Sequence, residues 1–157
     1  MKKMILAATV AALGFVMASA AEIPMKFNLI NKTNTTIADG VITVNNTDAK
    51  SGGVNCQVNI NQAAPAKIVL SGESKCDESL TKSKNAHDYS LYVDMTFMDG
   101  TKKYGVQTPF STETKEWQKK TVEFMPEKAI KQLRIYILYR NQTGKAQFKN
   151  LKLEEVK

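Results

Sequence analysis

The sequence predicts an all-β protein, an antiparallel β-sandwich of the jelly-roll type, and three observations favour this fold class. Short segments of alternating apolar and polar residues recur along the chain, turn residues separate them, and no segment has convincing α-helical spacing. The clearest segment runs from Tyr89 to Met98, where every odd-numbered residue is apolar. Leu133 to Arg140 alternates in the same way. Two such strands indicate a sheet with one apolar and one polar face.

The other strands follow from the same alternation and from the turn residues between them. Asp99-Gly100 indicates a hairpin turn, Asn31 to Thr36 a polar turn, and Ser74 to Ala86 a charged connection. The remaining predicted strands are Met25–Asn31, Val41–Val44, Val54–Ile60, Ala66–Leu70, Lys103–Phe110, Trp117–Phe124 and Gly144–Leu153.

Two of these strands carry finer predictions about which way their side chains point. Tyr104, Val106 and Phe110 are expected to share one side of their strand. The closing strand changes phase near Lys149 and Asn150, which predicts a β-bulge there.

The first twenty residues have the layout of a cleavable secretory leader of bacterial type. Lys2 and Lys3 precede an apolar run, and Ala18-Ser19-Ala20 supplies the small residues of a cleavage site. We expect residues 1–20 to be a signal peptide and residues 21–157 to form one β-sandwich domain that is secreted or periplasmic. No later stretch is long and apolar enough to span a bilayer, so we expect no transmembrane segment after the leader is removed.

The chain is basic, with a formal charge of +7 at pH 7. The leader contains two lysines and no acid, so its removal lowers the charge to +5. Such a surplus can attract acidic polymers, but the lysines are spread along the chain, which favours a solvated surface. Basic and aromatic residues alternate from Arg134 to Arg140 without a helix-turn-helix or RNA-reading motif, so we expect no nucleic-acid partner.

Cys56 and Cys76 are the two cysteines of the chain. Export favours a disulfide between them. Geometry opposes it: in a hairpin of Val54–Ile60 with Ala66–Ser74, Cys76 lies roughly 20 Å beyond the residue opposite Cys56, at ~3.3 Å per residue. Bridged Cα atoms lie within about 7 Å of each other. The sequence leaves both states open, the alternative being a buried thiol at Cys56.

The polar sides of three predicted strands carry the side chains that we expect to bind a ligand. If the apolar sides meet in one core, the opposite sides present amides, tyrosines, a carboxylate and guanidinium groups. Sugars are bound by such planar polar groups together with aromatic platforms for their apolar ring faces. The predicted ligand-binding residues are Asn55, Gln57, Asn59, Tyr92, Asp94, Trp117, Arg134, Tyr136 and Arg140. The alternative is that Asp94 pairs with Arg134 or Arg140 across the sheet and the amides cover an ordinary solvated face.

The position of Trp117 depends on whether its strand is regular. Trp117 precedes Phe124 by seven residues, so on an unbroken strand the two side chains point to opposite faces and Trp117 is a stacking platform. A bulge would return Trp117 to the core, the role that large aromatic residues fill more often.

The sequence predicts no enzymatic activity. His87 is the one histidine, and the chain has neither a Gly-x-Ser-x-Gly nucleophile turn nor a His-Glu-x-x-His metal motif. A glycosidase needs two opposed carboxylates. Asp94 and Glu123 are candidates for such a pair, but nothing in their spacing distinguishes them from surface acids.

From Gly52 onward the sequence resembles the secreted carbohydrate-binding-module jelly rolls of the galactose-binding-domain-like class. The resemblance is specific as an ordered set rather than in any single piece, and it implies a sandwich more strongly than it implies a sugar. The matching pieces are Gly52-Gly53 with Gln57, Ala66–Gly72, Asp88–Asp94 with Asp99-Gly100-Thr101, Pro109–Thr112, Trp117-Gln118, Phe124–Lys128 and Gly144–Phe148.

The resemblance also implies a structural calcium ion, because members of this class commonly carry an aspartate pair after the aromatic residue of the last strand. Lys149 and Asn150 occupy those positions here. Calcium prefers several oxygen ligands, and an ammonium group cannot be one. We therefore expect no cofactor, with the calcium site lost or weakened and the Lys149 ammonium in place of the cation.

The predicted function is non-catalytic glycan binding by the polar face of an exported jelly roll. The alternative is a structural or adhesion domain that binds a protein partner in the cell envelope.

Overall fold

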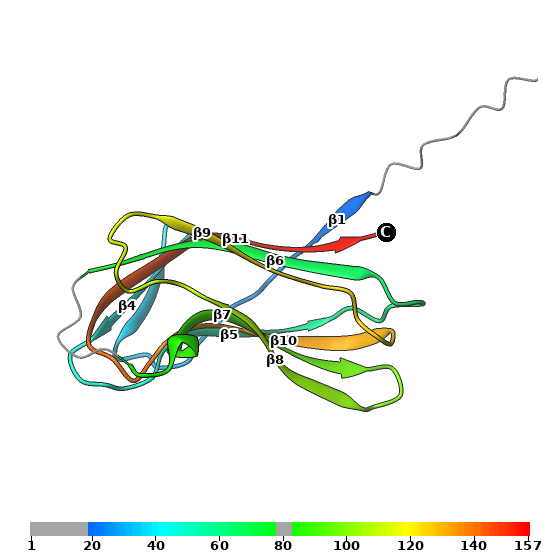
Figure 1. The fold of residues 1–157 in the computed structure, drawn as a ribbon, viewed down its shortest axis with the longest axis horizontal. Helices are drawn as coiled ribbons and strands as arrows, with labels where there is room; N and C mark the ends of the chain where they lie inside the picture. The colour runs from blue at the N-terminus through cyan, green and yellow to red at the C-terminus, as the bar shows by residue number, and fades with distance from the viewer. Residues whose placement is uncertain (1–18, 78–82) are drawn as a thin grey trace, which may run out of the picture.

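The computed structural model describes residues 19–77 and 83–157, which fold into two antiparallel sheets packed face to face (Figure 1). Sheet A has the strand order β3-β4-β11-β6-β9, with β1 also paired to β11, and sheet B has the order β2-β5-β10-β7-β8. The elements are β1 (Ala20–Ile23), β2 (Asn28–Leu29), β3 (Thr35–Ala38), β4 (Val41–Asn46), β5 (Gly52–Asn59), β6 (Lys67–Cys76), η1 (Ala86–Asp88), β7 (Tyr89–Phe97), β8 (Lys102–Pro109), β9 (Gln118–Phe124), β10 (Ile130–Tyr139) and β11 (Gly144–Val156). The predicted all-β jelly-roll sandwich is confirmed.

The predicted leader lies outside the described residues, except for Ser19 and Ala20 at its end. Ala20 begins β1 and pairs with Val156 of β11. In the described ranges, no helix is long and apolar enough to cross a membrane.

The core lies between the two sheets and contains the residues that the alternation predicts. Sheet B contributes fully buried residues from β7 and β10, such as Leu91 and Ile135, and sheet A contributes Leu70 and Leu153. At one end, four aromatic rings pack with centroids 5.1 to 5.9 Å apart: Tyr89, Phe110, Tyr139 and Phe148. Such aromatic contacts stabilise a core beyond the area that they bury.

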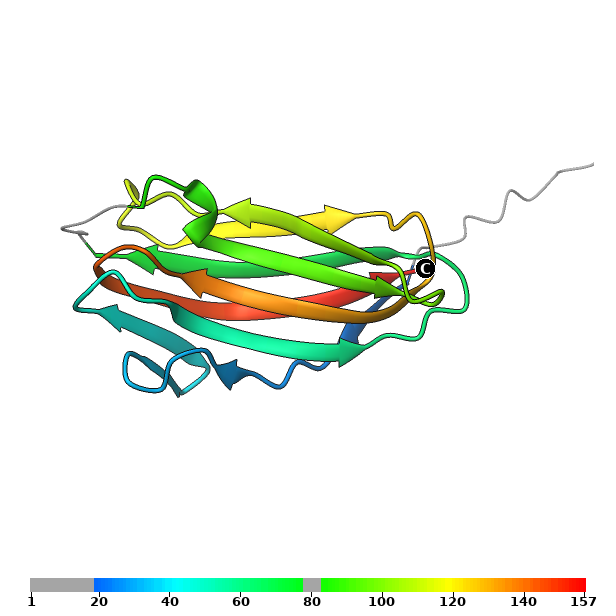
Figure 2. The same cartoon turned by 90° about the horizontal axis from the view of Figure 1, so that it is seen from below.

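Strand β10 lies at the centre of sheet B, with β5 on one side and β7 on the other (Figure 2). Its register is antiparallel and unbroken from Gln132 to Tyr139 with both neighbours. Because opposed residues in such a ladder point to the same side, the outer face of sheet B carries polar residues in rows across three strands.

The predicted bulge in the closing strand is confirmed. The pairing of β11 with β6 shifts register between Lys149 and Lys152, and Asn150 has a φ of 51°. The bulge reverses the phase of the strand, so that Phe148 before it and Leu153 after it both lie in the core.

The hairpin of β5 with β6 that served to weigh the disulfide does not form, because the two strands belong to different sheets. The connecting residue Gln62 is buried between the sheets rather than exposed in a turn. Its side-chain amide donates to Glu155 Oε1 at 2.9 Å and its Oε1 accepts from the Ile130 amide at 2.9 Å. These hydrogen bonds stabilise a crossing from one sheet to the other.

The amino-terminal strands also differ from the prediction. Of the predicted strand Met25–Asn31, only Asn28–Leu29 pairs in a sheet, although Met25 and Phe27 pack against the core. The predicted polar turn at Asn31 to Thr36 ends in β3, which forms a hairpin with β4.

Cys56 and Cys76 are both buried and are not bonded to each other, so the disulfide that the sequence left open does not form. Cys56 lies opposite Ile135 in sheet B, whereas Cys76 ends β6 in sheet A. Burial raises the pKa of the Cys56 thiol to about 11, so the neutral and unreactive form predominates.

Replacing Gly53 with alanine should destabilise the sandwich strongly. Gly53 has a φ of +116°, and a Cβ there would lie 2.0 Å from the backbone oxygen of Ile137 in β10. Gly40 is a matched control, since its φ is +73° and nothing lies within 4 Å of an added Cβ. We expect Gly40→Ala to cost about 1–2 kcal/mol, the cost of a left-handed conformation alone, and Gly53→Ala to cost more. Urea unfolding measures both; equal costs would contradict the close approach of β5 to β10.

Candidate functional site

The outer face of sheet B brings together all the predicted ligand-binding residues except Trp117. Tyr136 lies between Asn55 of β5 and Tyr92 of β7, in one row across the three strands. The next row places Arg134 between Gln57 and Asp94, and the row after it pairs Asn59 with Gln132. Arg140 follows directly after β10.

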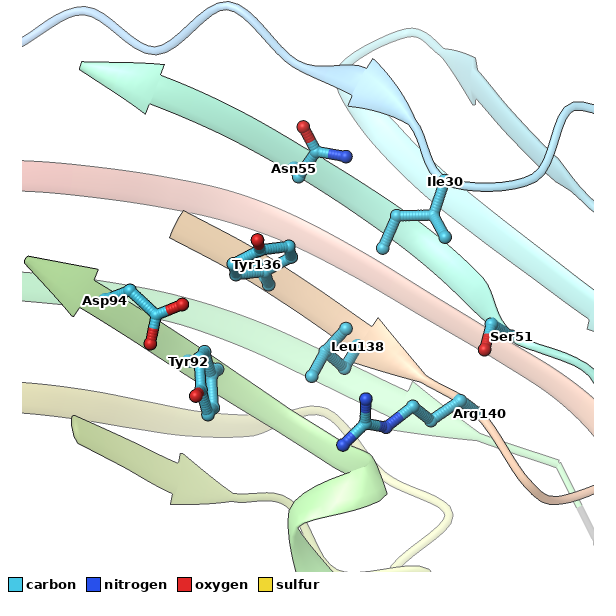
Figure 3. Close-up of a pocket in the computed structure, with 8 residues that line it drawn as sticks. All are labelled: Ile30, Ser51, Asn55, Tyr92, Asp94, Tyr136, Leu138 and Arg140. Atoms are coloured by element: carbon cyan, nitrogen blue, oxygen red, sulfur yellow. The ribbon is translucent and has the colours of Figure 1, made fainter. Parts of the chain in front are cut away.

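A groove on this face passes along β10, and we call it the sheet B groove (Figure 3). Its larger part has a volume of about 370 Å³ and is lined by Ile30, Ser51, Asn55, Tyr92, Asp94, Tyr136, Leu138 and Arg140. A smaller hollow of about 100 Å³ shares Asp94 and is lined by Met95, Thr96, Lys102, Tyr104, Gln132 and Arg134. Asp94 therefore joins two hollows that together extend over the rows of polar residues.

Two tyrosines form the centre of the groove. The rings of Tyr92 and Tyr136 meet edge to face, with centroids 5.7 Å apart and planes at 76°. Both residues are half-buried, so each presents part of an apolar ring and a hydroxyl group to the groove. Burial raises the pKa of Tyr92, and the neighbouring Asp94 carboxylate raises it further, so its hydroxyl stays protonated and can donate a hydrogen bond.

A bulge in β8 adds a third tyrosine to the face. The register of β7 with β8 shifts between Val93 and Met95, so Tyr104 and Gly105 both lie opposite Asp94. Asp94 Oδ1 accepts the Gly105 amide at 3.2 Å, and Gly105 has a φ of +80°. Tyr104 is 65% exposed.

The prediction that Tyr104 shares a side with Val106 and Phe110 is therefore wrong. The bulge turns Tyr104 out of the core phase and into the smaller hollow. Gly105 was the sequence signal that could have revealed this, because a glycine inside a strand often marks a bulge.

Arg140 is held by Asp88 and not by Asp94. Arg140 Nε donates to Asp88 Oδ1 at 2.6 Å, and Asp88 is 2% exposed. Arg134 Nη2 instead donates to Gln57 Oε1 at 3.3 Å. Within the described residues, no ion pair joins Asp94 to either arginine, so the cross-sheet pairing that was the alternative interpretation does not form.

The ionisation of Asp88 follows from its partners. Burial opposes the charged form, but hydrogen bonds from Ser83, Asn141 and Arg140 and the charge of Arg140 outweigh it and lower the pKa of Asp88. Asp88 was not among the predicted site residues, because the sequence does not show that η1 brings it against the end of β10. Arg140 N–H donates to the Asp88 backbone oxygen at 3.0 Å, which joins these two segments.

Gln107 is a further residue that the sequence did not indicate. It lies directly opposite Tyr92 in the β7–β8 ladder, so its side chain is on the outer face of sheet B. Its Oε1 is buried and has no hydrogen-bond partner among the described residues. A buried acceptor of this kind is completed by water or by a ligand.

Trp117 is not part of this groove. It precedes β9 in sheet A, where the Lys149 ammonium lies 4.0 Å and the Lys75 ammonium 5.1 Å from its ring centroid. Trp117 is half-buried, so it is neither a core residue nor an open platform. Its inclusion with the residues of sheet B is wrong, because strand phase does not reveal to which sheet a strand belongs.

The residues at the β11 bulge do not fit a calcium ion. Glu73 is a carboxylate beside the two implied positions, and Asn150 Nδ2 donates to its Oε1 at 2.9 Å. The Lys149 ammonium lies 3.7 Å from the other oxygen of Glu73. The described part of the chain contains no cluster of three or more His, Cys, Asp or Glu side chains that could hold a metal.

Chelation should therefore leave the stability of the protein unchanged. We expect the melting temperature in EDTA to equal that in millimolar calcium, because Lys149 already supplies a positive charge beside Glu73. A melting temperature several degrees higher with calcium, or one stoichiometric calcium in the purified protein, would contradict this account.

Asp94 and Glu123 cannot form the two-carboxylate arrangement of a glycosidase. Asp94 lies on the outer face of sheet B, whereas Glu123 is in β9 of sheet A and pairs with Lys67 at 2.7 Å.

Comparison with solved structures identifies the fold. The carbohydrate-binding module CBM4 has a TM-score of 0.50 and 14% identity, over 82% of this chain and 77% of that one. The enzymatically active domain of tailspike protein 4 from bacteriophage CBA120 has a TM-score of 0.52 and 11% identity, over 88% of this chain and 19% of that one. The CBM22-1 xylan-binding domain of Paenibacillus barcinonensis Xyn10C has a TM-score of 0.49 and 14% identity, over 88% of this chain and 86% of that one.

The protein has the jelly-roll fold of a carbohydrate-binding module. Identities of this size establish the fold alone. No family model and no curated protein matches the sequence.

Proposed function

We propose that the protein binds carbohydrate without transforming it, through the sheet B groove, after export from the cell. The observation that carries this proposal is the pair of half-buried tyrosines, Tyr92 and Tyr136, surrounded by planar polar groups. Sugar rings have apolar C–H faces and a dense rim of hydroxyl groups, and both find partners in this arrangement.

The polar groups of the groove match the hydroxyl rim of a sugar. Asn55 offers both a donor and an acceptor, Asp94 offers acceptors, and Arg140 offers donors. Leu138 and Ile30 form an apolar wall at the Arg140 end, where a ring face or a methylene group can pack. The two hollows on either side of Asp94 provide room for more than one sugar unit.

The proposed lack of catalysis follows from the acids available in the groove. Among the described residues, Asp94 is the one carboxylate that lines either hollow, and hydrolysis of a glycosidic bond by the common route needs two. Asp88 lies beside the groove, but its carboxylate accepts hydrogen bonds from three side chains, which favour its charged form and make it a poor proton donor.

The leader-like residues 1–20 support export, so the ligand that we propose lies outside the cytoplasm. The large apolar side chains exposed in the described residues are Ile37 in β3, Met98 and Tyr104 in the β7–β8 hairpin, and Met125 after β9. They do not form a continuous strand face, which favours a glycan over a protein partner in the envelope.

Replacing the two central tyrosines should abolish glycan binding with little loss of stability. We expect Tyr92→Ala and Tyr136→Ala each to weaken binding at least about tenfold, the equivalent of about 1.4 kcal/mol. Their free energies of unfolding should fall by less than about 1.5 kcal/mol, since both rings are half-buried. Calorimetry with a glycan selected on an array measures the first effect, and urea unfolding the second.

Trp117→Ala is the control, because it removes an aromatic ring from the other sheet and should leave glycan affinity unchanged. An affinity unaltered in both tyrosine variants would refute the groove as the site. No bound glycan at millimolar concentration, with an envelope protein recovered by pull-down, would refute the function itself.

A further inference from the structure

Arg140 presents the two terminal nitrogens of its guanidinium group, which we call its fork, to the sheet B groove. A guanidinium group has five N–H donors, and Asp88 accepts only the one on Nε, at 2.6 Å. No described residue accepts a hydrogen bond from the two terminal nitrogens. Figure 3 shows these nitrogens directed toward Tyr92 and Leu138, and the side chain is 38% exposed.

Asp88 holds this fork in place through Nε, and the two terminal nitrogens have no hydrogen-bond acceptor among the residues that the structure describes. Its Oδ2 accepts from Ser83 Oγ at 2.5 Å and from Asn141 Nδ2 at 2.8 Å, while Oδ1 accepts from Arg140. The carboxylate is therefore fixed from three directions in a site that is 2% exposed. A guanidinium held through Nε keeps the two parallel terminal donors that bind a carboxylate or sulfate in bidentate fashion.

A second arginine, without an acidic partner among the described residues, lies at the other end of the groove. Arg134 has a neutral partner, Gln57, at 3.3 Å, and it lies in the hollow with Lys102. Asp94, the acid of this region, accepts the Gly105 amide and pairs with neither arginine within the described residues. Arg134 and Arg140 are six residues apart along β10, which is roughly 20 Å at ~3.3 Å per residue. In the described part of the groove, cations thus outnumber carboxylates and stand at both of its ends.

We propose that the ligand of the groove is an acidic glycan. One of its carboxylate or sulfate groups binds the fork of Arg140, and another, further along the glycan, binds Arg134. This inference rests on the proposed function and names its substrate class. Tyr92 and Tyr136, between the two arginines, then contact the ring faces, and Asp88 is a positioning residue for Arg140.

The decisive experiment compares ligands that differ only in charge. Oligogalacturonate and oligomannuronate are titrated by calorimetry at fixed ionic strength beside their methyl esters, which keep the sugar chain and lose the negative charge. Carrageenan oligosaccharides beside their desulfated forms distinguish sulfate from carboxylate. We expect at least one acidic member to bind about ten times more tightly than its neutral partner.

Variants test whether Arg140 is the cause of that preference. Arg140→Lys keeps the charge and loses the fork, so it should lower the affinity for the acidic glycan much more than the affinity for its neutral partner, and thereby remove most of the acidic preference. Asp88→Asn, which frees the guanidinium, should reduce the preference in part. Its melting temperature shows whether it is folded, and Arg140→Lys serves as the second test where it is not. Lys119→Gln, on sheet A, is the control for net charge and should retain the preference in full.

The outcomes separate this inference from the proposed function. Equal affinity for acidic and neutral partners, lost in Tyr92→Ala, would overturn the acidic ligand and leave carbohydrate binding in place. A preference that survives Arg140→Lys but falls in Lys119→Gln would overturn the site and indicate general attraction to a basic protein. If none of these glycans and no glycan of an array binds, both the acidic ligand and the proposed carbohydrate binding are overturned.

Discussion

The ladder that joins β10 to β5 and β7 determines where the side chains of the proposed site lie. Leu133, Ile135 and Ile137 on the inner face of β10 are fully buried. A slip of one residue would expose all three and turn the polar residues into the core. Core packing therefore sets the register, and the register places Tyr136 between Asn55 and Tyr92. The polar face is a consequence of the apolar one.

Two local departures from this regular ladder enlarge the site. The bulge at Gly105 turns Tyr104 outward and gives Asp94 a backbone partner. The short helix η1 places Asp88 against the end of β10, where it holds Arg140. Both departures direct side chains toward the same groove. The irregular parts of sheet B and its regular rows therefore contribute side chains to one surface.

The outer face of sheet A has a different character. Lys67 pairs with Glu123 at 2.7 Å and Lys152 pairs with Glu154 at 2.9 Å, as on an ordinary solvated surface. Trp117 is covered by the ammonium groups of Lys149 and Lys75. A ring with cations over it is a poor platform for a sugar, which supports the proposal that the ligand binds in the sheet B groove rather than at Trp117.

Strand parity in the sequence was sufficient to predict the sandwich, the bulge near Lys149 and the shared face of Asn55, Tyr92 and Tyr136. It was insufficient where the outcome depends on contacts between distant segments. The crossing of β5 to β6 through Gln62, in place of a hairpin, is stabilised by partners far along the chain that the sequence does not reveal. Trp117 was placed with the residues of sheet B for the same reason, because strand parity shows on which side of a strand a residue lies but not to which sheet the strand belongs. Asp88 could not be assigned because its role depends on Arg140, 52 residues away.

Chemical-shift mapping tests the central claim most directly. An oligosaccharide that binds is added to the isotopically labelled protein, and backbone amide shifts are followed by nuclear magnetic resonance. The account predicts that the largest shifts fall on β5, β7 and β10, around Asn55, Tyr92 and Tyr136, with Trp117 and Lys149 unmoved. Shifts concentrated on the outer face of sheet A, with sheet B unchanged, would contradict it.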